Sequence, residues 1–194
     1  MAIILIGGSA LLIDHYAFAI KPGAPPPTIE RVNSCTGTKV AEVDQSRLHY
    51  PSCWTLGNYA DSSMMTTVVA FISNQTMHPP CVTKKSGIGT TTSCGFPIKS
   101  LNHAGALIMV VEGGMPGWTI SKETGRYFVV DHHPARESVS KKHLRSLNAT
   151  EEISVSIDAG VPDNYYQIVG FFRGPGVAND TRRFNEMVTT FQIH

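Results

Sequence analysis

The chain has 194 residues, of which 42% are hydrophobic and only 16% are charged. This composition excludes an intrinsically disordered protein, and the length is that of one domain with a short appended segment. The formal net charge of +1 provides no long-range field for a phosphate backbone, so we expect no nucleic-acid partner.

The N-terminal segment 1–19 is apolar, and a proline-rich linker follows it at 20–34. Its apolar stretch has the length of a signal-peptide core, and Ala17-Phe18-Ala19 has the pattern that signal peptidase accepts. The stretch is too short for a membrane-spanning helix, which needs about 20 apolar residues. Two interpretations stay open: a cleaved signal peptide, or a retained arm that is exchanged with a neighbouring subunit or contacts a membrane. Either interpretation leaves a single domain at 35–194.

Within that domain, glycine and proline recur at intervals of about 8 to 15 residues, the spacing of strands in a sandwich or barrel. Continuous runs of β-branched and aromatic residues predict strands buried on both faces at 66–72, 104–111 and 165–172. The alternation of isoleucine and valine with serine at 153–157 predicts a half-exposed strand. The pattern favours a mainly-β fold, an antiparallel β-sandwich of the jelly-roll or immunoglobulin-like type.

The remaining segments are assigned from shorter signals. We expect a short strand at 118–120 between two turns, and a closing strand at 188–193. Residues 135–147 follow Pro134 and become basic toward their end, where the helix macrodipole favours positive charge. We therefore predict one short exposed helix near 135–147.

The four cysteines, Cys35, Cys53, Cys81 and Cys94, indicate a disulfide framework. Of the three connectivities that four cysteines allow, we favour Cys35–Cys53 with Cys81–Cys94, because each pair brackets residues that can turn a hairpin. A tetrathiolate zinc site would need two closely spaced cysteine pairs, which the sequence lacks. Free thiols in a cytosolic protein are the other alternative.

Three Asn-x-Thr sequons, at Asn74, Asn148 and Asn179, are a mild excess over chance. Together with the paired cysteines and the apolar N-terminal segment, they predict a secreted, extracellular glycoprotein.

Aromatic residues beside turns suggest a carbohydrate site. An aromatic face stacks on a sugar ring while amides and carboxylates bind its hydroxyls. The candidate ligand-binding residues are Trp54, Asn58, Tyr59, Trp118, Asp163, Asn164 and Tyr165. The alternative is that these aromatic rings fill the core or cover strand edges, as they commonly do in β-proteins.

A metal site is the competing hypothesis. Asp131, His133 and His143 belong to the densest cluster of metal-ligating residue types in the chain. On a strand, Asp131 and His133 share a face that His132 does not. The sequence contains no zinc-enzyme histidine motif and no Gly-x-Ser-x-Gly, so we assign no catalytic residue and no cofactor.

Basic pairs occur at Lys84-Lys85, Lys141-Lys142 and Arg182-Arg183. Such pairs can serve anionic headgroups or glycosaminoglycan chains, although separate pairs on a neutral protein are more commonly ordinary surface charge.

The interpretation that these features share is a secreted, non-enzymatic, disulfide-bonded glycoprotein with a lectin-like, storage or defence role. We expect a carbohydrate ligand and a homo-oligomer or another assembly partner. One alternative is an extracellular metal-dependent enzyme using the Asp131, His133 and His143 cluster. The other is a membrane-active, capsid or filament subunit that uses the apolar N-terminal arm.

Overall fold

The computed structural model of the chain describes residues 35–57, 61–62, 66–86 and 89–194. The predicted N-terminal segment 1–19 and linker 20–34 lie outside the described residues, as do the candidate ligand residues Asn58 and Tyr59. Cys35–His194 forms one compact unit.

The elements are β1 (Thr38–Val43), β2 (Ser46–Pro51), β3 (Thr55–Gly57), β4 (Asp61–Ser62), β5 (Thr66–Ser73), β6 (Cys81–Ser86), β7 (Gly89–Cys94), β8 (Gly105–Gly114), the 3-10 helix η1 (Ile120–Lys122), β9 (Arg126–Val130), β10 (His133–Ser140), β11 (Glu151–Asp158), β12 (Asn164–Arg173), α1 (Val177–Thr189) and β13 (Gln192–Ile193).

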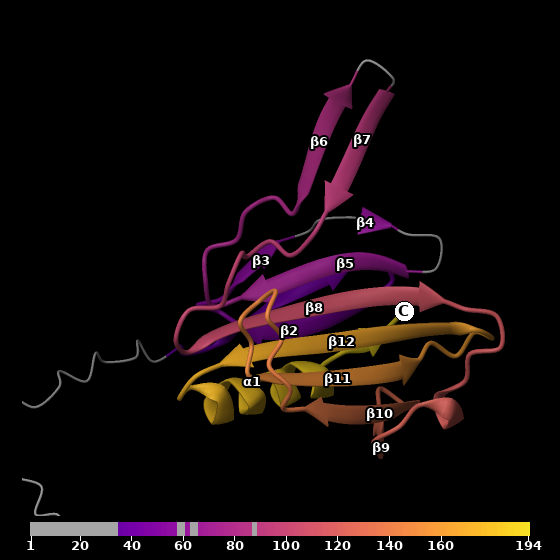
Figure 1. Cartoon of the computed structure of the whole chain (residues 1–194). Coiled ribbons are helices and arrows are strands. Elements are labelled where there is room, and N and C mark those ends of the chain that lie inside the picture. Colours follow the sequence, from indigo (N-terminus) through magenta and orange to yellow (C-terminus); the bar gives the residue numbers. More distant parts are fainter. Residues whose placement is uncertain (1–34, 58–60, 63–65, 87–88) are drawn as a thin grey trace, which may run out of the picture. The chain divides into compact units, whose positions relative to one another are not determined.

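The described strands form three antiparallel sheets (Figure 1). The large sheet has the order β3-β5-β8-β12-β11-β10-β9, with β4 also paired to β5. The strands β1, β2 and β13 form a small sheet, and β6 and β7 form a separate hairpin. The helix α1 contacts β2, β12 and β8, so the small sheet and the helix together make the second layer. The predicted mainly-β, antiparallel, sandwich-like fold is confirmed.

The central strands β5, β8 and β12 are covered on both faces, as their continuous apolar runs predicted. Alternate side chains such as Ile108 and Ile168 enter the main core, beneath the small sheet and α1. Leu107, next to Ile108 in the chain, and Phe171, opposite Leu107 on β12, point to the other side of the sheet. They belong to a second core, which also contains Ile98, Leu101, Leu147 and Ala149 from two loops. A strand buried on both faces must be apolar at every position, because successive side chains point to opposite sides.

The prediction of a helix near 135–147 is wrong. Residues 133–140 form β10, which pairs with β9 on one side and β11 on the other. The segment that follows is a turn closed by a bridge between Leu144 and Ala149. Pairing along both edges gives the backbone of β10 its hydrogen bonds, and this tertiary contribution outweighs the local charge pattern that suggested a helix.

The helix of the structure lies instead at the C-terminal end, where α1 buries Phe184, Met187 and Val188 against the large sheet. The expected closing strand at 188–193 is therefore correct only for β13, and residues 118–120 lead into η1 rather than forming a strand. In a chain of β-branched residues, the helical spacing of Phe184, Met187 and Val188 was the signal for this helix.

Both predicted disulfides are present, Cys35–Cys53 and Cys81–Cys94. The first joins the residues before β1 to the turn after β2, and Cys35 packs against the main core. The second joins directly opposed residues at the base of the β6–β7 hairpin, which contributes no described side chain to either core.

The two disulfides should therefore differ in their effect on stability. We expect the Cys35→Ser/Cys53→Ser double variant to lower the free energy of unfolding by about 3 kcal/mol, because the core loses a cross-link that restricts the unfolded chain. The Cys81→Ser/Cys94→Ser variant should open the hairpin and leave the core stable, because an isolated two-stranded hairpin is marginal in water. Urea denaturation measures the first effect and amide hydrogen exchange the second. A large global loss in the hairpin variant would contradict this division.

Candidate functional site

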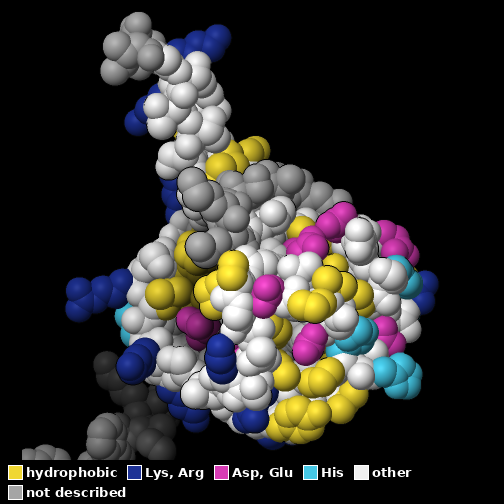
Figure 2. Space-filling view, turned by 90° about the vertical axis from the view of Figure 1, so that its right-hand side faces the viewer, with side chains coloured by type: hydrophobic (Ala, Val, Ile, Leu, Met, Phe, Trp, Pro, Cys, Tyr) yellow, Lys and Arg dark blue, Asp and Glu magenta, His cyan; other side chains and the backbone are white. Residues whose placement is uncertain are grey.

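A cleft of about 360 Å³ lies at the end of the large sheet where β8 ends and β12 begins. It is formed by two loops, residues 118–121 and residues 158–164. Figure 2 looks onto this end of the molecule, where hydrophobic side chains and carboxylates are interspersed on the surface. We call this hollow the loop cleft.

Trp118 lines the loop cleft and packs on Tyr165, whose position depends on a glycine. Tyr165 is paired with Gly113 across β12 and β8. A Cβ atom on Gly113 would lie 2.3 Å from the Tyr165 ring, so the ring crosses β8 only because this position has no side chain. Trp118 stacks on Tyr165, with ring centroids 4.8 Å apart and an angle of 30° between the planes. The indole of Trp118 is held in place by a hydrogen bond from its Nε1 to Glu123 Oε1, at 2.8 Å.

Two carboxylates hold the loops in shape. Asp163 Oδ1 accepts a hydrogen bond from the Gly117 amide at 2.8 Å, and the Asp163 carbonyl accepts one from Met115 at 2.9 Å. Asp158 Oδ1 accepts a hydrogen bond from the Gly160 amide, also at 2.8 Å. Among the described residues, the second carboxylate oxygen of each aspartate makes no hydrogen bond. These oxygens are therefore unused hydrogen-bond acceptors within the described part of the chain.

The loop cleft combines apolar and polar groups. Trp118, Val161 and Pro162 supply apolar surface, while the Asp158, Asp163 and Asn164 side chains supply acceptors and an amide. Pockets that bind small molecules have this composition, a mainly apolar wall with a few fixed polar groups. Carboxylates beside an aromatic edge suit a ligand that presents hydroxyl groups and an apolar ring face.

The structure brings together four of the seven predicted ligand residues: Trp118, Asp163, Asn164 and Tyr165. Trp54 is elsewhere, in the main core, with 2% of its surface exposed. It fills the core there, as the alternative interpretation of the aromatic residues anticipated. Sequence reasoning left out Asp158, and the signal that marks it is the Gly-Val-Pro-Asp turn that follows.

The structure does not gather the predicted metal ligands. Asp131 Oδ2 accepts a hydrogen bond from the Ile193 amide at 3.1 Å, and His133 begins β10. His143 lies beyond the other end of that strand, about 25 Å of extended chain away, and its Nε2 is 2.9 Å from the side-chain amide of Asn148. No group of three or more His, Cys, Asp or Glu suited to a metal occurs among the described residues.

The three sequon asparagines differ in environment. Asn74 is exposed, but its amide bonds the backbone of Ala104 and Ala106 at 2.9 Å each. Asn148 is half-buried beside His143. Asn179 lies on the exposed first turn of α1, where its Oδ1 accepts a hydrogen bond from Arg182 at 2.8 Å. Of the three, Asn179 presents its side chain to solvent with the least backbone involvement.

A pair of carboxyl groups joins the small sheet to the large one. Glu112 on β8 forms a side-chain hydrogen bond with Asp44, which lies in the β1–β2 turn. Burial, and then the neighbouring Asp44, raise the pKa of Glu112. Tyr166 lies opposite Glu112 in the β12–β8 register, and burial with the two nearby carboxylates raises the pKa of Tyr166 to about 12. The side chain of Glu112 thus joins β8 of the large sheet to the β1–β2 turn of the small one.

The raised pKa of Glu112 predicts a dependence of stability on pH. Because the pKa of Glu112 is higher in the folded than in the unfolded chain, the folded state binds more protons, and stability falls as pH rises above the ordinary value of 4.5. We expect Glu112→Gln to raise the melting temperature more at pH 8 than at pH 4, because glutamine donates to Asp44 without charge. Thermal melts of both proteins across this range test the expectation, and an equal difference at both pH values would contradict it.

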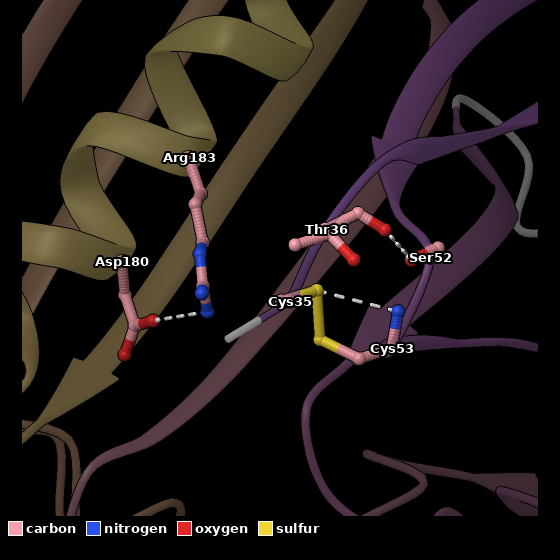
Figure 3. The surroundings of a disulfide bond; sticks show 6 residues. All are labelled: Cys35, Thr36, Ser52, Cys53, Asp180 and Arg183. Carbon is pink, nitrogen blue, oxygen red and sulfur yellow. Dashed lines mark hydrogen bonds and ion pairs between the residues drawn. A yellow bond between two sulfur atoms is a disulfide. The ribbon is translucent and has the colours of Figure 1, made fainter. Parts of the chain in front are cut away.

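A second buried carboxyl group lies in α1, close to the first disulfide. Figure 3 draws Asp180 and Arg183 in the surroundings of Cys35–Cys53, with Arg183 Nη1 3.7 Å from Asp180 Oδ1. Asp180 is only 4% exposed. Burial raises the pKa of Asp180 to about 6, and Arg183 opposes the rise. The two residues are three positions apart in α1, so their ion pair lies within the helix.

Asp180 should make its own contribution to the pH dependence. Its folded pKa is above the ordinary 3.8, so its stabilising effect is complete at low pH and is lost as pH rises through about 6. The loss is up to about 3 kcal/mol for a shift of this size. We expect Asp180→Asn to flatten the unfolding free energy between pH 4 and pH 8, measured by urea titration, with the exposed Glu186→Gln as control. A profile as steep as that of the unmodified protein would contradict the assignment.

Comparisons with protein-family models, curated proteins and solved structures found no match to this chain. None of the described helices has the length and apolar character needed to cross a membrane. The functional proposal therefore depends on the geometry of the described residues.

Proposed function

We propose that this protein is a secreted, disulfide-stabilised β-sandwich glycoprotein that binds a neutral carbohydrate in the loop cleft and catalyses no reaction. The observation that carries the proposal is the stacked Trp118–Tyr165 pair beside two carboxylates, each with one oxygen available to a ligand.

Two disulfides support an oxidising compartment. Disulfides persist in secreted proteins and are rare in the reducing cytosol. All four cysteines of the chain are paired, so none is left as a reactive thiol or a metal ligand. The exposed sequon at Asn179 agrees with passage through a secretory pathway.

The size and charge of the loop cleft support a small neutral sugar. Its volume of about 360 Å³ is near the lower end of ligand pockets, which span about 300–1,000 Å³. Asp158 and Asp163 repel an anionic ligand and accept hydrogen bonds from sugar hydroxyls. The exposed side chains of Val161 and Pro162, beside the buried Trp118, offer the apolar contact that a sugar ring uses.

A binding role agrees better with these loops than a catalytic one. Asp158 and Asp163 each use one oxygen to fix the backbone of their own loop. Groups committed in this way hold a preformed site at little entropic cost on binding, which is the property a binding protein requires.

Tryptophan fluorescence tests the proposal. The chain has two tryptophans, and the buried Trp54 Nε1 has no hydrogen-bond partner among the described residues, so Trp54→Phe leaves Trp118 as the only indole reporter without breaking a hydrogen bond. In this background we expect one or more neutral mono- or disaccharides to change the Trp118 emission. Asp163→Asn and Asp158→Asn keep an acceptor for the loop amides and should weaken binding about tenfold.

The matched control is Glu42→Gln, an exposed carboxylate on β1. It should leave the affinity unchanged. Equal affinity of the Asp163 and Asp158 variants and the parent protein, or a full panel of neutral sugars without effect at millimolar concentration, would overturn the proposal.

A further inference from the structure

The β6–β7 hairpin stands apart from the large sheet (Figure 1). Its base is fixed by the Cys81–Cys94 disulfide and by a hydrogen bond from the Gly95 amide to the Pro80 carbonyl, at 3.0 Å. Above the base, the hydroxyls of Thr83 and Thr92 are 3.0 Å apart across the ribbon. Because its described residues pack into neither core, the hairpin is a clamped projection whose side chains are available to a partner.

The hairpin and its flanking segments contain lysine residues but no acidic residues. From Ser62 to Val111 the chain contains Lys84, Lys85 and Lys99 but no Asp or Glu. The first two lysines are exposed neighbours on β6 and therefore point to opposite faces of the ribbon. The ion pairs among the described residues involve none of these lysines. Figure 2 shows basic side chains, in dark blue, on the projecting hairpin, and in the sequence of β6 and β7 these are lysines.

A cavity of about 650 Å³ lies at the foot of the hairpin, and we call it the foot cavity. The polar residues that line it include Lys99, Gln75 and Asn102. Its apolar lining includes Phe96 and Pro80. None of the described residues that line it is acidic, so the foot cavity is a donor-rich hollow with apolar walls.

One of these donors is buried without a partner. Gln75 Oε1 accepts a hydrogen bond from the Asn102 amide at 3.2 Å, whereas Gln75 Nε2 is buried and has no partner among the described residues. The amide packs over Gly105, where a Cβ atom would overlap Nε2. A buried donor left unpaired is unfavourable, and an acceptor on a bound ligand would relieve this cost.

We propose that the hairpin and the foot cavity form a binding surface for an anionic polysaccharide. One anionic group of the chain lies in the foot cavity, near Lys99 and the Gln75 amide, and the chain continues along the hairpin past Lys84 or Lys85. Phe96 and Pro80 contact the apolar face of a sugar ring, and the threonine hydroxyls of β7 contact its hydroxyls. This surface is separate from the loop cleft, whose carboxylates would repel the same ligand.

The described surface favours a polysaccharide over a lipid bilayer. Val82, at 57% exposure, is the one large apolar side chain that the described part of the hairpin presents to solvent. Insertion into a bilayer gains free energy in proportion to the apolar area buried, and this area is small. A concave hollow with both donors and apolar walls fits a sugar unit with a charged substituent better than a planar surface.

The experiment measures the binding of heparin to the whole protein by isothermal titration calorimetry at 50 and 150 mM NaCl. We expect binding that weakens as the salt concentration rises, and no binding of neutral dextran. The Lys84→Gln/Lys85→Gln variant and the Lys99→Gln variant should each weaken heparin binding about tenfold or more. The control is Lys141→Gln/Lys142→Gln, a pair of equal charge on another exposed loop, which should keep the parent affinity.

Gln75→Glu tests the foot cavity itself. This variant keeps the acceptor for the Asn102 amide and replaces the donor with a negative charge, so heparin binding should be lost while circular dichroism shows the same fold. If Gln75→Glu unfolds, Lys99→Gln carries the same test with an exposed residue. Equal losses in the Lys141/Lys142 control, no heparin binding at 150 mM NaCl, or binding of anionic vesicles in place of heparin would each overturn the proposal.

The outcome is independent of the proposed function of the loop cleft. Loss of heparin binding in the lysine variants with an unchanged Trp118 response to neutral sugars supports this surface alone. Unchanged heparin binding in Asp163→Asn confirms that the two surfaces act separately, and a loss there would contradict the separation.

Discussion

The structure depends on the burial of three neighbouring strands, β5, β8 and β12, on both of their faces. One face is covered by the small sheet and α1, and the other by the loops that carry Leu101 and Leu147. Burial of this apolar area is the dominant favourable term in folding, and it fixes the register of the strands because a slip of one residue would exchange the two cores. The loops at the ends of these strands are positioned by this register.

Both candidate binding surfaces are products of that arrangement. The pairing of Tyr165 with Gly113 positions the ring on which Trp118 stacks at the loop cleft, and the start of β8 at Gly105 sets the place of Gln75 at the foot cavity. The loops then differ in charge: carboxylates at one site, and lysine with amide donors at the other. The net charge of +1 is therefore the sum over the whole chain, and it does not reveal that the two surfaces differ in local charge.

The sequence predictions were correct where the stabilising interactions leave a local pattern in the chain, and they failed where the interacting residues are distant in sequence. Apolar runs predicted the central strands, since burial on two faces is visible in every residue of the run. The sequential cysteine pairing was predicted because both bonds close short local loops. The helix at 135–147 failed because β10 is stabilised by partners distant in sequence, and α1 was missed where an expected closing strand hid the helical spacing of Phe184 and Met187.

By itself, the sequence determined the mainly-β, antiparallel class and the two disulfides, and it marked aromatic residues and carboxylates beside turns as candidates for a ligand site. Only the tertiary structure decided that Trp118 and Tyr165 share a site while Trp54 fills the core, and that Asp131 and His143 lie far apart. The physical reason is that alternation and turn chemistry act between neighbours in the chain, whereas a site is assembled by strand pairing and loop packing between residues that no local pattern connects.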